Sequence, residues 1–132
     1  MAYLIDTDIL IYSMKGNPVV HDNFQLHMKD IKAISVISYG ELIFGAKKSK
    51  ESTKNMAAVR RLSEIFPIVE ITKNIIEIFG ELKAKLVKSG TVLDEMDLLI
   101  AASAINMNYT LVTNNEKHFS RLKELEMENW SK

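Results

Sequence analysis

Three acidic side chains occupy positions that solvation by water alone does not explain. Asp6 directly follows a short apolar run at residues 3–5, and Glu41 and Asp97 each lie among apolar residues. A carboxylate at the end of a buried strand loses hydration energy unless a helix N-terminus, a cation or a metal compensates for the loss. The sequence therefore raises the question of what these carboxylates bind.

Each of these carboxylates also has an ordinary structural explanation. Asp6 is a suitable N-cap for a helix that begins at residue 7. Ser38 and Glu41 fit the S-x-x-E pattern of a capping box. Asp94 would cap a helix in whose first turn the helix dipole favours Asp97. Each explanation is sufficient alone, but three together in so small a domain are less satisfying than one shared site.

A shared acidic site predicts a divalent cation. If the three side chains converge, repulsion between like charges disfavours the site without a cation. Carboxylate oxygens suit hard cations such as Mg²⁺ or Mn²⁺ rather than zinc. The chain has no cysteine, which excludes a thiolate metal site, a cysteine nucleophile and a disulfide framework. The spacing of the three acids does not by itself demonstrate convergence.

Length and composition indicate one ordinary domain over residues 1–132. The chain is 47% hydrophobic and 26% charged, and it has no linker, low-complexity tract or internal repeat. Its longest apolar run is far short of the roughly 20 residues that span a bilayer. Asp6 and Asp8 interrupt any signal-peptide core. We therefore expect a cytoplasmic protein without membrane contact.

The charge of the chain is balanced, with 17 basic and 17 acidic side chains. Attraction of nucleic acid through the overall field is therefore not expected, and RNA binding would depend on local basic patches. The candidates are Lys47, Lys48, Lys50, Lys54, Arg60, Arg61, Lys83, Lys85 and Lys88. For each of these groups, a solvated helix face is the better interpretation.

Apolar periodicity and turn residues predict short strands that alternate with helices. Strands are expected at residues 2–5, 32–34, 67–71, 109–112 and 125–128. Helices are expected at 7–12, 18–28, 35–46, 51–65, 73–88 and 94–107, and residues 113–115 are expected to form a loop. Such an alternation predicts a parallel sheet covered on both faces, with ligands at the carboxyl ends of its strands. Asp6 and Thr113 both follow strands and are expected at that edge.

Four segments in order resemble the PIN domain, and in particular the VapC ribonuclease toxins of toxin–antitoxin modules. They are LIDTD at 4–8, ISVISYGEL at 34–42 followed by Gly45, DLLIAA at 97–102, and LVTNN at 111–115 followed by His118 and Phe119. Their order and spacing extend over nearly the whole chain. The resemblance implies an α/β fold, a PIN-like three-layer α/β/α sandwich with a short central parallel sheet.

The resemblance also implies an endoribonuclease that depends on Mg²⁺ or Mn²⁺. Asp6, Glu41 and Asp97 match the three acidic ligands of the family. Thr7 and Thr113 match small hydroxyl positions that line its pocket.

One position departs from the family pattern. A fourth acidic residue often stands two residues after the second threonine, but this chain has Asn115 there, as one branch of these toxins does. The number of ions therefore stays open. The sequence does not decide whether Asp8 binds metal or only caps a helix, nor whether Asp94, Glu95 or His118 contributes.

Partners follow from the same resemblance. Relatives are usually dimers, and an antitoxin whose tail enters the acidic groove neutralises them, so a homodimer and a cognate VapB-type antitoxin are expected. The branch with Thr-Asn-Asn resembles toxins that cut initiator tRNA in the anticodon stem-loop. An RNA substrate, and specifically a tRNA, is therefore the expectation.

Two other interpretations rest on short features. The D-T-D segment at 6–8 resembles the D-x-D of aspartyl-phosphate phosphatases, in which the first Asp is a nucleophile, but Leu10 stands where that family has Thr or Val. A catalytically degenerate PIN domain that only binds RNA or protein is the other alternative. Asn115 is its single supporting feature, and three intact acids argue against it.

A metal-free ribonuclease is a further alternative, since histidine can serve as its acid and base. The chain has three histidines. His21 and His27 are expected to be solvated on a helix with mixed faces. His118 is expected near the edge of the pocket, packed or capping beside Phe119.

Overall fold

A short apolar strand forms the centre of the fold. In the computed structural model, which describes residues 1–132, β1 (Ala2–Ile5) pairs in parallel with β2 (Ile31–Ser35) and β4 (Thr110–Val112). The edge strands are β3 (Ile68–Val69) beside β2 and β5 (Met127–Glu128) beside β4, both also parallel. The strand order is therefore β3-β2-β1-β4-β5, and the order reverses between β1 and β4.

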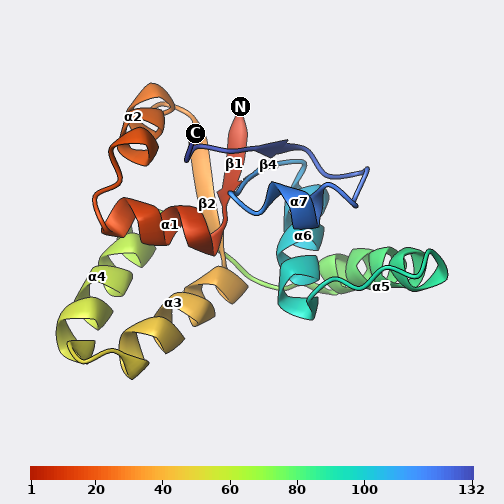
Figure 1. Ribbon diagram of the computed structural model, residues 1–132, viewed down its shortest axis with the longest axis horizontal. Coiled ribbons are helices and arrows are strands. Elements are labelled where there is room, and N and C mark those ends of the chain that lie inside the picture. Colours follow the sequence, from red (N-terminus) through yellow and green to blue (C-terminus); the bar gives the residue numbers. More distant parts are fainter.

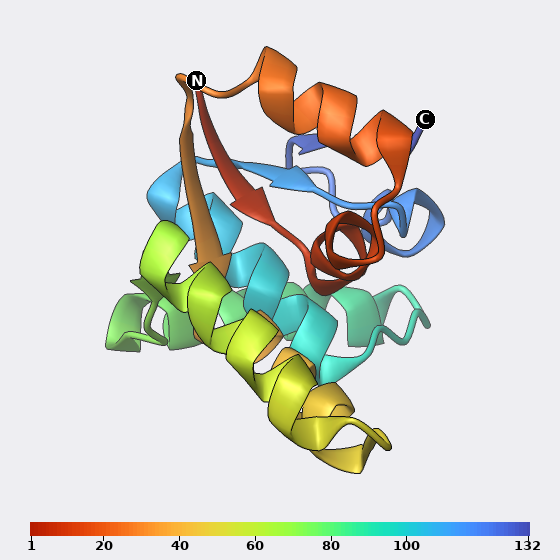
Figure 2. The same cartoon turned by 90° about the vertical axis from the view of Figure 1, so that its left-hand side faces the viewer.

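Seven helices cover the two faces of this sheet, as Figures 1 and 2 show. They are α1 (Thr7–Met14), α2 (Pro18–Leu26), α3 (Val36–Lys48), α4 (Ser52–Ile65), α5 (Lys73–Lys88), α6 (Glu95–Met107) and α7 (Glu116–Phe119). Helices α1 to α4 contribute to the core on one face, and α5 to α7 contribute to the core on the other. The predicted α/β/α sandwich with a short parallel sheet is confirmed. None of the helices combines the length and apolar content that crossing a bilayer requires.

Successive residues of each central strand enter opposite cores. In β1, Leu4 belongs to the core beneath α5 and α6, whereas Ile5 belongs to the core beneath α1 to α4. Leu111 and Val112 of β4 divide in the same way. Because side chains alternate along a strand, a sheet covered on both faces needs apolar residues at consecutive positions. This is why the central strands are continuous apolar runs.

Side-chain caps fix where the helices begin. Asp94 caps α6 by accepting hydrogen bonds from the Met96 and Asp97 amides at 3.1 and 3.4 Å, as predicted. Helix α3 is capped by Ser35, whose hydroxyl accepts from the Ile37 amide at 3.1 Å. The predicted capping box of residues 38 and 41 is therefore wrong, because α3 begins directly after β2 and both residues lie inside the helix.

The shortest elements differ most from the predictions. Strand β3 occupies only 68–69 of the predicted 67–71, and β5 only 127–128 of 125–128. Helix α7, at 116–119, was not predicted. One helical turn is too short to produce a periodic apolar pattern, so packing of Phe119 into the core, and not local sequence, decides its formation.

The C-terminal segment is anchored by a buried indole. Trp130 is 2% exposed and stacks on His27, with ring centroids 4.5 Å apart and an interplanar angle of 5°. Tyr3 and Phe24 meet the indole edge-on at 5.1 and 5.2 Å. The prediction that His27 is solvated is therefore wrong, because its ring is a surface on which the last buried aromatic residue packs. His21 is exposed as predicted.

We expect Trp130→Ala to lower the free energy of unfolding by about 3–5 kcal/mol, because it removes a large buried aromatic side chain and leaves a cavity. Urea denaturation measures this loss. The control is Leu26→Ala, next to His27 at the end of α2 but 77% exposed, which should change stability by less than about 0.5 kcal/mol. Similar losses in both variants would contradict the anchoring role of the indole.

Candidate active site

One hollow of about 310 Å³ lies at the carboxyl edge of the sheet. Its lining comes from four separate parts of the chain: the start of α1, the middle of α3, the first turn of α6, and the loop after β4. The lining residues are Asp6, Thr7, Asp8, Ile11, Glu41, Asp97, Asn114 and Asn115. The fold thus brings the three acids singled out from the sequence to one place, and no lysine or arginine lines it.

Asp6 is the most buried of these carboxylates, at 6% exposed. It caps α1 by accepting a hydrogen bond from the Thr7 amide at 2.8 Å, and its other oxygen accepts from the Thr113 hydroxyl at 2.8 Å. Burial, which is the largest cause, and the nearby Asp8 carboxylate raise the pKa of Asp6, and the two hydrogen bonds oppose this only in part, so that the pKa is about 7. Asp6 is therefore both a helix cap and a destabilised anion.

Glu41 reaches the hollow from the exposed side of α3. Its Oε1 accepts a hydrogen bond from the Thr7 hydroxyl at 2.6 Å. The same hydroxyl oxygen lies 2.9 Å from the hydroxyl of the fully buried Ser38. Because a hydroxyl has one proton, Thr7 donates to the carboxylate and can accept from Ser38. These two hydrogen bonds orient the Glu41 side chain toward α1.

Asp97 is partly buried in the first turn of α6. Burial raises its pKa, and the carboxylates of Asp94 and Glu41 raise it further. The His118 ring opposes this effect, since its Nδ1 lies 3.8 Å from Oδ2 of Asp97. His118 is half exposed and lies 2.9 Å, Nδ1 to Nδ2, from Asn115. It borders the hollow without lining it.

Asp8 lines the hollow and is also held by the backbone. Its Oδ1 accepts from the Ile9 amide at 2.7 Å, and its Oδ2 accepts from the Asn114 amide at 3.1 Å. Burial raises the pKa of Asp8 despite these hydrogen bonds, and Glu41 adds to the rise. Local capping and a place in the site are thus compatible at this residue.

The loop after β4 contributes three consecutive residues. Thr113 is fully buried behind Asp6, donates to it, and accepts from the Asn115 amide at 2.9 Å. Asn114 and Asn115 line the hollow itself. The sequence pattern singled out Thr113 and Asn115 but missed Asn114 as a separate contributor, together with Ile11, whose side chain is the one apolar part of the lining.

Glu95 lies outside the hollow although it follows Asp94 directly. Its carboxylate pairs with Lys83 at 2.6 Å, on the exposed surface between α5 and α6. Asp94 is likewise absent from the lining and serves as the cap of α6. Both residues therefore affect the site only through the position and charge of the first turn of α6.

The donor set suits a hard divalent cation. Four carboxylates, a threonine hydroxyl and two amide side chains supply oxygen ligands, and there is no thiolate or imidazole in the lining. Burial raises the pKa values of Asp6, Asp8 and Asp97, and the charge of His118 opposes this rise only at Asp97. No three of these groups already meet at ligating distance, so rotation of side chains would accompany ion binding.

A parallel α/β/α sandwich with an acidic hollow at the carboxyl edge of its sheet is the architecture of PIN domains. Residues 3–125 match the PIN domain family. Ribonuclease VapC2 of Rickettsia felis is 37% identical over 134 residues, with full coverage of both chains. The chain belongs to the PIN domain family and, within it, to the VapC ribonuclease toxins.

Solved structures agree with this assignment. VapBC2 from Rickettsia felis, bound to a DNA fragment from its promoter, matches with a TM-score of 0.93 and 36% identity over 98% of this chain and 99% of that chain. VapBC-1 from nontypeable Haemophilus influenzae matches with a TM-score of 0.89 and 34% identity over all of both chains. The tRNA(fMet)-specific endonuclease VapC of Shigella flexneri is 29% identical over 99% of both chains. The predicted family and ribonuclease class are confirmed.

We expect the ion-free protein to lose stability as the pH rises. The pKa of Asp6 is raised to about 7, so the folded state holds this proton more tightly than the unfolded chain does. The resulting stability is complete below the unfolded pKa of about 4 and is lost as the pH rises through 7. Linkage predicts a loss of about 2–3 kcal/mol between pH 5 and 8, which urea denaturation in EDTA would measure.

The matched control for this pH dependence is Asp6→Asn, which removes the titrating group and keeps its shape. Between pH 5 and 8, the free energy of unfolding of the variant should fall by about 2–3 kcal/mol less than that of the wild type. At pH 8 the variant should be at least as stable as the wild type. An equal decline in both proteins would contradict the assignment.

Proposed function

We propose that this VapC toxin is an endoribonuclease that uses Mg²⁺ or Mn²⁺ held by Asp6, Glu41 and Asp97, and that it cleaves tRNA. The observation that carries the proposal is the convergence of these side chains, with Asp8, on one hollow that contains no basic residue. Such a hollow repels a phosphodiester unless a cation neutralises it. The need for a metal therefore follows from the charges of the site.

Each ligand residue has a separate support within the chain. Asp6 is held by the Thr7 amide and the Thr113 hydroxyl, and Glu41 is held by the Thr7 hydroxyl. A bound Mg²⁺ or Mn²⁺ ion supplies charge stabilisation at the scissile phosphate and a water of lowered pKa. Thr7 contacts two of the carboxylates, because its amide donates to Asp6 and its hydroxyl donates to Glu41, and so it couples their orientations. Hydrolysis of this type leaves a 5′-phosphate and a 3′-hydroxyl.

Asn115 takes the place of a fourth carboxylate. Its amide offers a carbonyl oxygen to the hollow, and its NH₂ group lies against His118. A neutral oxygen attracts a second ion less strongly than a carboxylate would. The site therefore favours one firmly held ion, with Asn115 contributing to the arrangement of water or of the phosphate.

Exposed apolar side chains on the helices that contribute to the hollow support an antitoxin as the partner. Ile11 of α1 lines the hollow, Met14 of the same helix is partly exposed, Phe44 of α3 is 65% exposed, and Met96 directly precedes Asp97. A peptide that carries apolar residues and a basic side chain would complement these side chains and the acidic hollow. The two solved relatives named above are VapBC complexes. We infer a VapB-type antitoxin and a homodimeric toxin.

Histidine catalysis is not supported by the geometry. None of the three histidines lines the hollow, and His27 is occupied in packing against Trp130. His118 is the nearest, at 3.8 Å from Asp97, where it affects the charge of that carboxylate. Activity that persists in EDTA would be needed to restore this alternative.

We expect purified protein to cleave RNA with Mn²⁺ or Mg²⁺ and to lose this activity in EDTA. Asp97→Asn should lower kcat about 100-fold or more while the protein stays folded, because it removes a ligand charge worth several kcal/mol in the transition state. The control is Glu95→Gln, in the same helical turn but paired with Lys83, which should stay within about twofold of the wild type. Metal-dependent cleavage at the wild-type rate in both Asp97→Asn and Asp6→Asn would refute the site.

We expect initiator tRNA to be cut in the anticodon stem-loop in preference to elongator tRNAs. This expectation follows from the similarity to a tRNA(fMet)-specific endonuclease over the full chain. Mapping of new 5′ ends in total RNA after incubation with Mn²⁺ measures the preference. Cuts distributed over ribosomal or messenger RNA would contradict the tRNA substrate while leaving the metal-dependent ribonuclease intact.

A further inference from the structure

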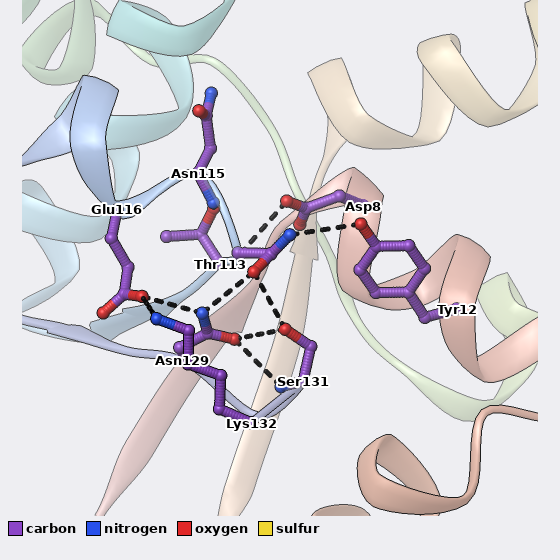
Figure 3. A network of polar contacts seen from close by, with 9 residues as sticks. Asp8, Tyr12, Thr113, Asn115, Glu116, Asn129, Ser131 and Lys132 are labelled. Atoms are coloured by element: carbon purple, nitrogen blue, oxygen red, sulfur yellow. Dashed lines mark hydrogen bonds and ion pairs between the residues drawn. The ribbon is translucent and has the colours of Figure 1, made fainter.

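The last four residues of the chain lie against the loop that borders the active site. Trp130 anchors this segment in the core, and its carbonyl oxygen accepts a hydrogen bond from Asn23 at 2.9 Å. The residues on either side of it, Asn129 and Ser131, turn their side chains to the loop after β4, as Figure 3 shows. We call residues 129–132 the tail. Its anchor and its polar contacts therefore come from different side chains.

The Asn129 side chain hydrogen-bonds to three other residues. Its NH₂ group donates to Asn114 Oδ1 at 3.0 Å and to Glu116 Oε2 at 2.8 Å. Its carbonyl oxygen accepts from the Ser131 amide and lies 2.6 Å from the Ser131 hydroxyl. The Ser131 hydroxyl has one proton, which it donates either to Asn129 or to Asn114. The two bonds from the NH₂ group and the bond from the Ser131 amide already give the Asn129 side chain one orientation only. Asn129 thus hydrogen-bonds to Asn114 and Glu116, the two neighbours of Asn115. Asn115 is the residue at the fourth ligand position.

Asn114 transmits this arrangement to the site. Its Oδ1 accepts from Asn129 and lies 3.0 Å from the Ser131 hydroxyl, and its NH₂ group donates to the Tyr12 hydroxyl at 3.2 Å. With the side chain fixed at both ends, the backbone amide of Asn114 points at Asp8 Oδ2, 3.1 Å away. Figure 3 shows this continuous path from the tail through the loop to Asp8.

We propose that Asn114 is a positioning residue for the acidic site, and that Asn129 and Ser131 of the tail fix its orientation. The tail then sets the place of Asp8 and of the loop that carries Asn115. Lys132 adds a further contact between the tail and the loop, because its ammonium group lies 3.0 Å from the Glu116 carboxylate. The inference rests on the proposed metal-dependent function for its consequence, but the positioning itself is a property of the protein alone.

The test compares two asparagine-to-alanine variants that remove hydrogen bonds to or from the same tail. Asn129→Ala removes the hydrogen bonds to the loop. Asn23→Ala removes the contact with the Trp130 carbonyl and a contact with the Val19 carbonyl in its own helix, and neither of these involves the loop. In amide hydrogen exchange by NMR, the Asn114 amide should exchange about five- to tenfold faster in Asn129→Ala and at the wild-type rate in Asn23→Ala. Comparable thermal stability of the two variants would show that the difference is local.

Binding of Mn²⁺ alone, followed by calorimetry, gives the second readout. Removal of a group that orients residues of a metal site typically weakens metal binding 10- to 100-fold. We therefore expect Mn²⁺ to bind about tenfold more weakly to Asn129→Ala and with unchanged affinity to Asn23→Ala. Ser131→Ala should show a smaller effect in the same direction, and Ser131→Thr, which keeps the hydroxyl, should restore wild-type affinity. This pair decides the question if Asn129→Ala does not fold.

The outcomes separate the two proposals. Unchanged exchange of the Asn114 amide in Asn129→Ala and Ser131→Ala would overturn the positioning role, whatever the metal does. Faster exchange in those variants, together with a wild type that binds no Mn²⁺, would support the positioning role and overturn the proposed metal-dependent function. Faster exchange with weaker Mn²⁺ binding supports both.

Discussion

Burial of the Asp6 carboxylate at the end of the central strand is the constraint on which the site depends. Strand β1 lies between two parallel neighbours, so the residue that follows it is at an edge that water scarcely reaches. Hydrogen bonds from Thr7 and Thr113 compensate only in part for the lost hydration, and the pKa of Asp6 is therefore raised to about 7. No basic residue lines the hollow. These charges are the physical basis for the divalent cation proposed at this edge of the sheet.

Burial of the acidic site lowers the stability of the ion-free protein at neutral pH. At neutral pH the folded, ion-free protein holds Asp6, Asp8 and Asp97 in surroundings that raise the pKa of each and so disfavour their charged forms. Cores on both faces of the sheet, with Trp130 closing one of them, provide the stability that allows this. Binding of the proposed ion would relieve this repulsion and would therefore stabilise the folded protein.

Elements with strong local signals were predictable from the sequence. The helices at 73–88 and 94–107 have an apolar face or a fully apolar body, and the central strands are continuous apolar runs, so periodicity and length identified them. Their alternation was enough to predict the parallel sandwich. The two-residue strands β3 and β5 and the single turn of α7 were imprecise or missed, since packing against the sheet and not local propensity forms them.

The sequence by itself determined the candidate acids, because Asp6 directly follows an apolar strand and Glu41 and Asp97 each lie among apolar residues. Only the tertiary structure decided how these groups are supported: that Ser35 and not Ser38 caps α3, that Thr7 serves two carboxylates, and that the tail grips Asn114. The physical reason is the range of the interactions. Hydrophobic periodicity is a local property that a single sequence displays, whereas hydrogen bonds between segments far apart in the chain exist only after sheet register and helix packing have brought them together.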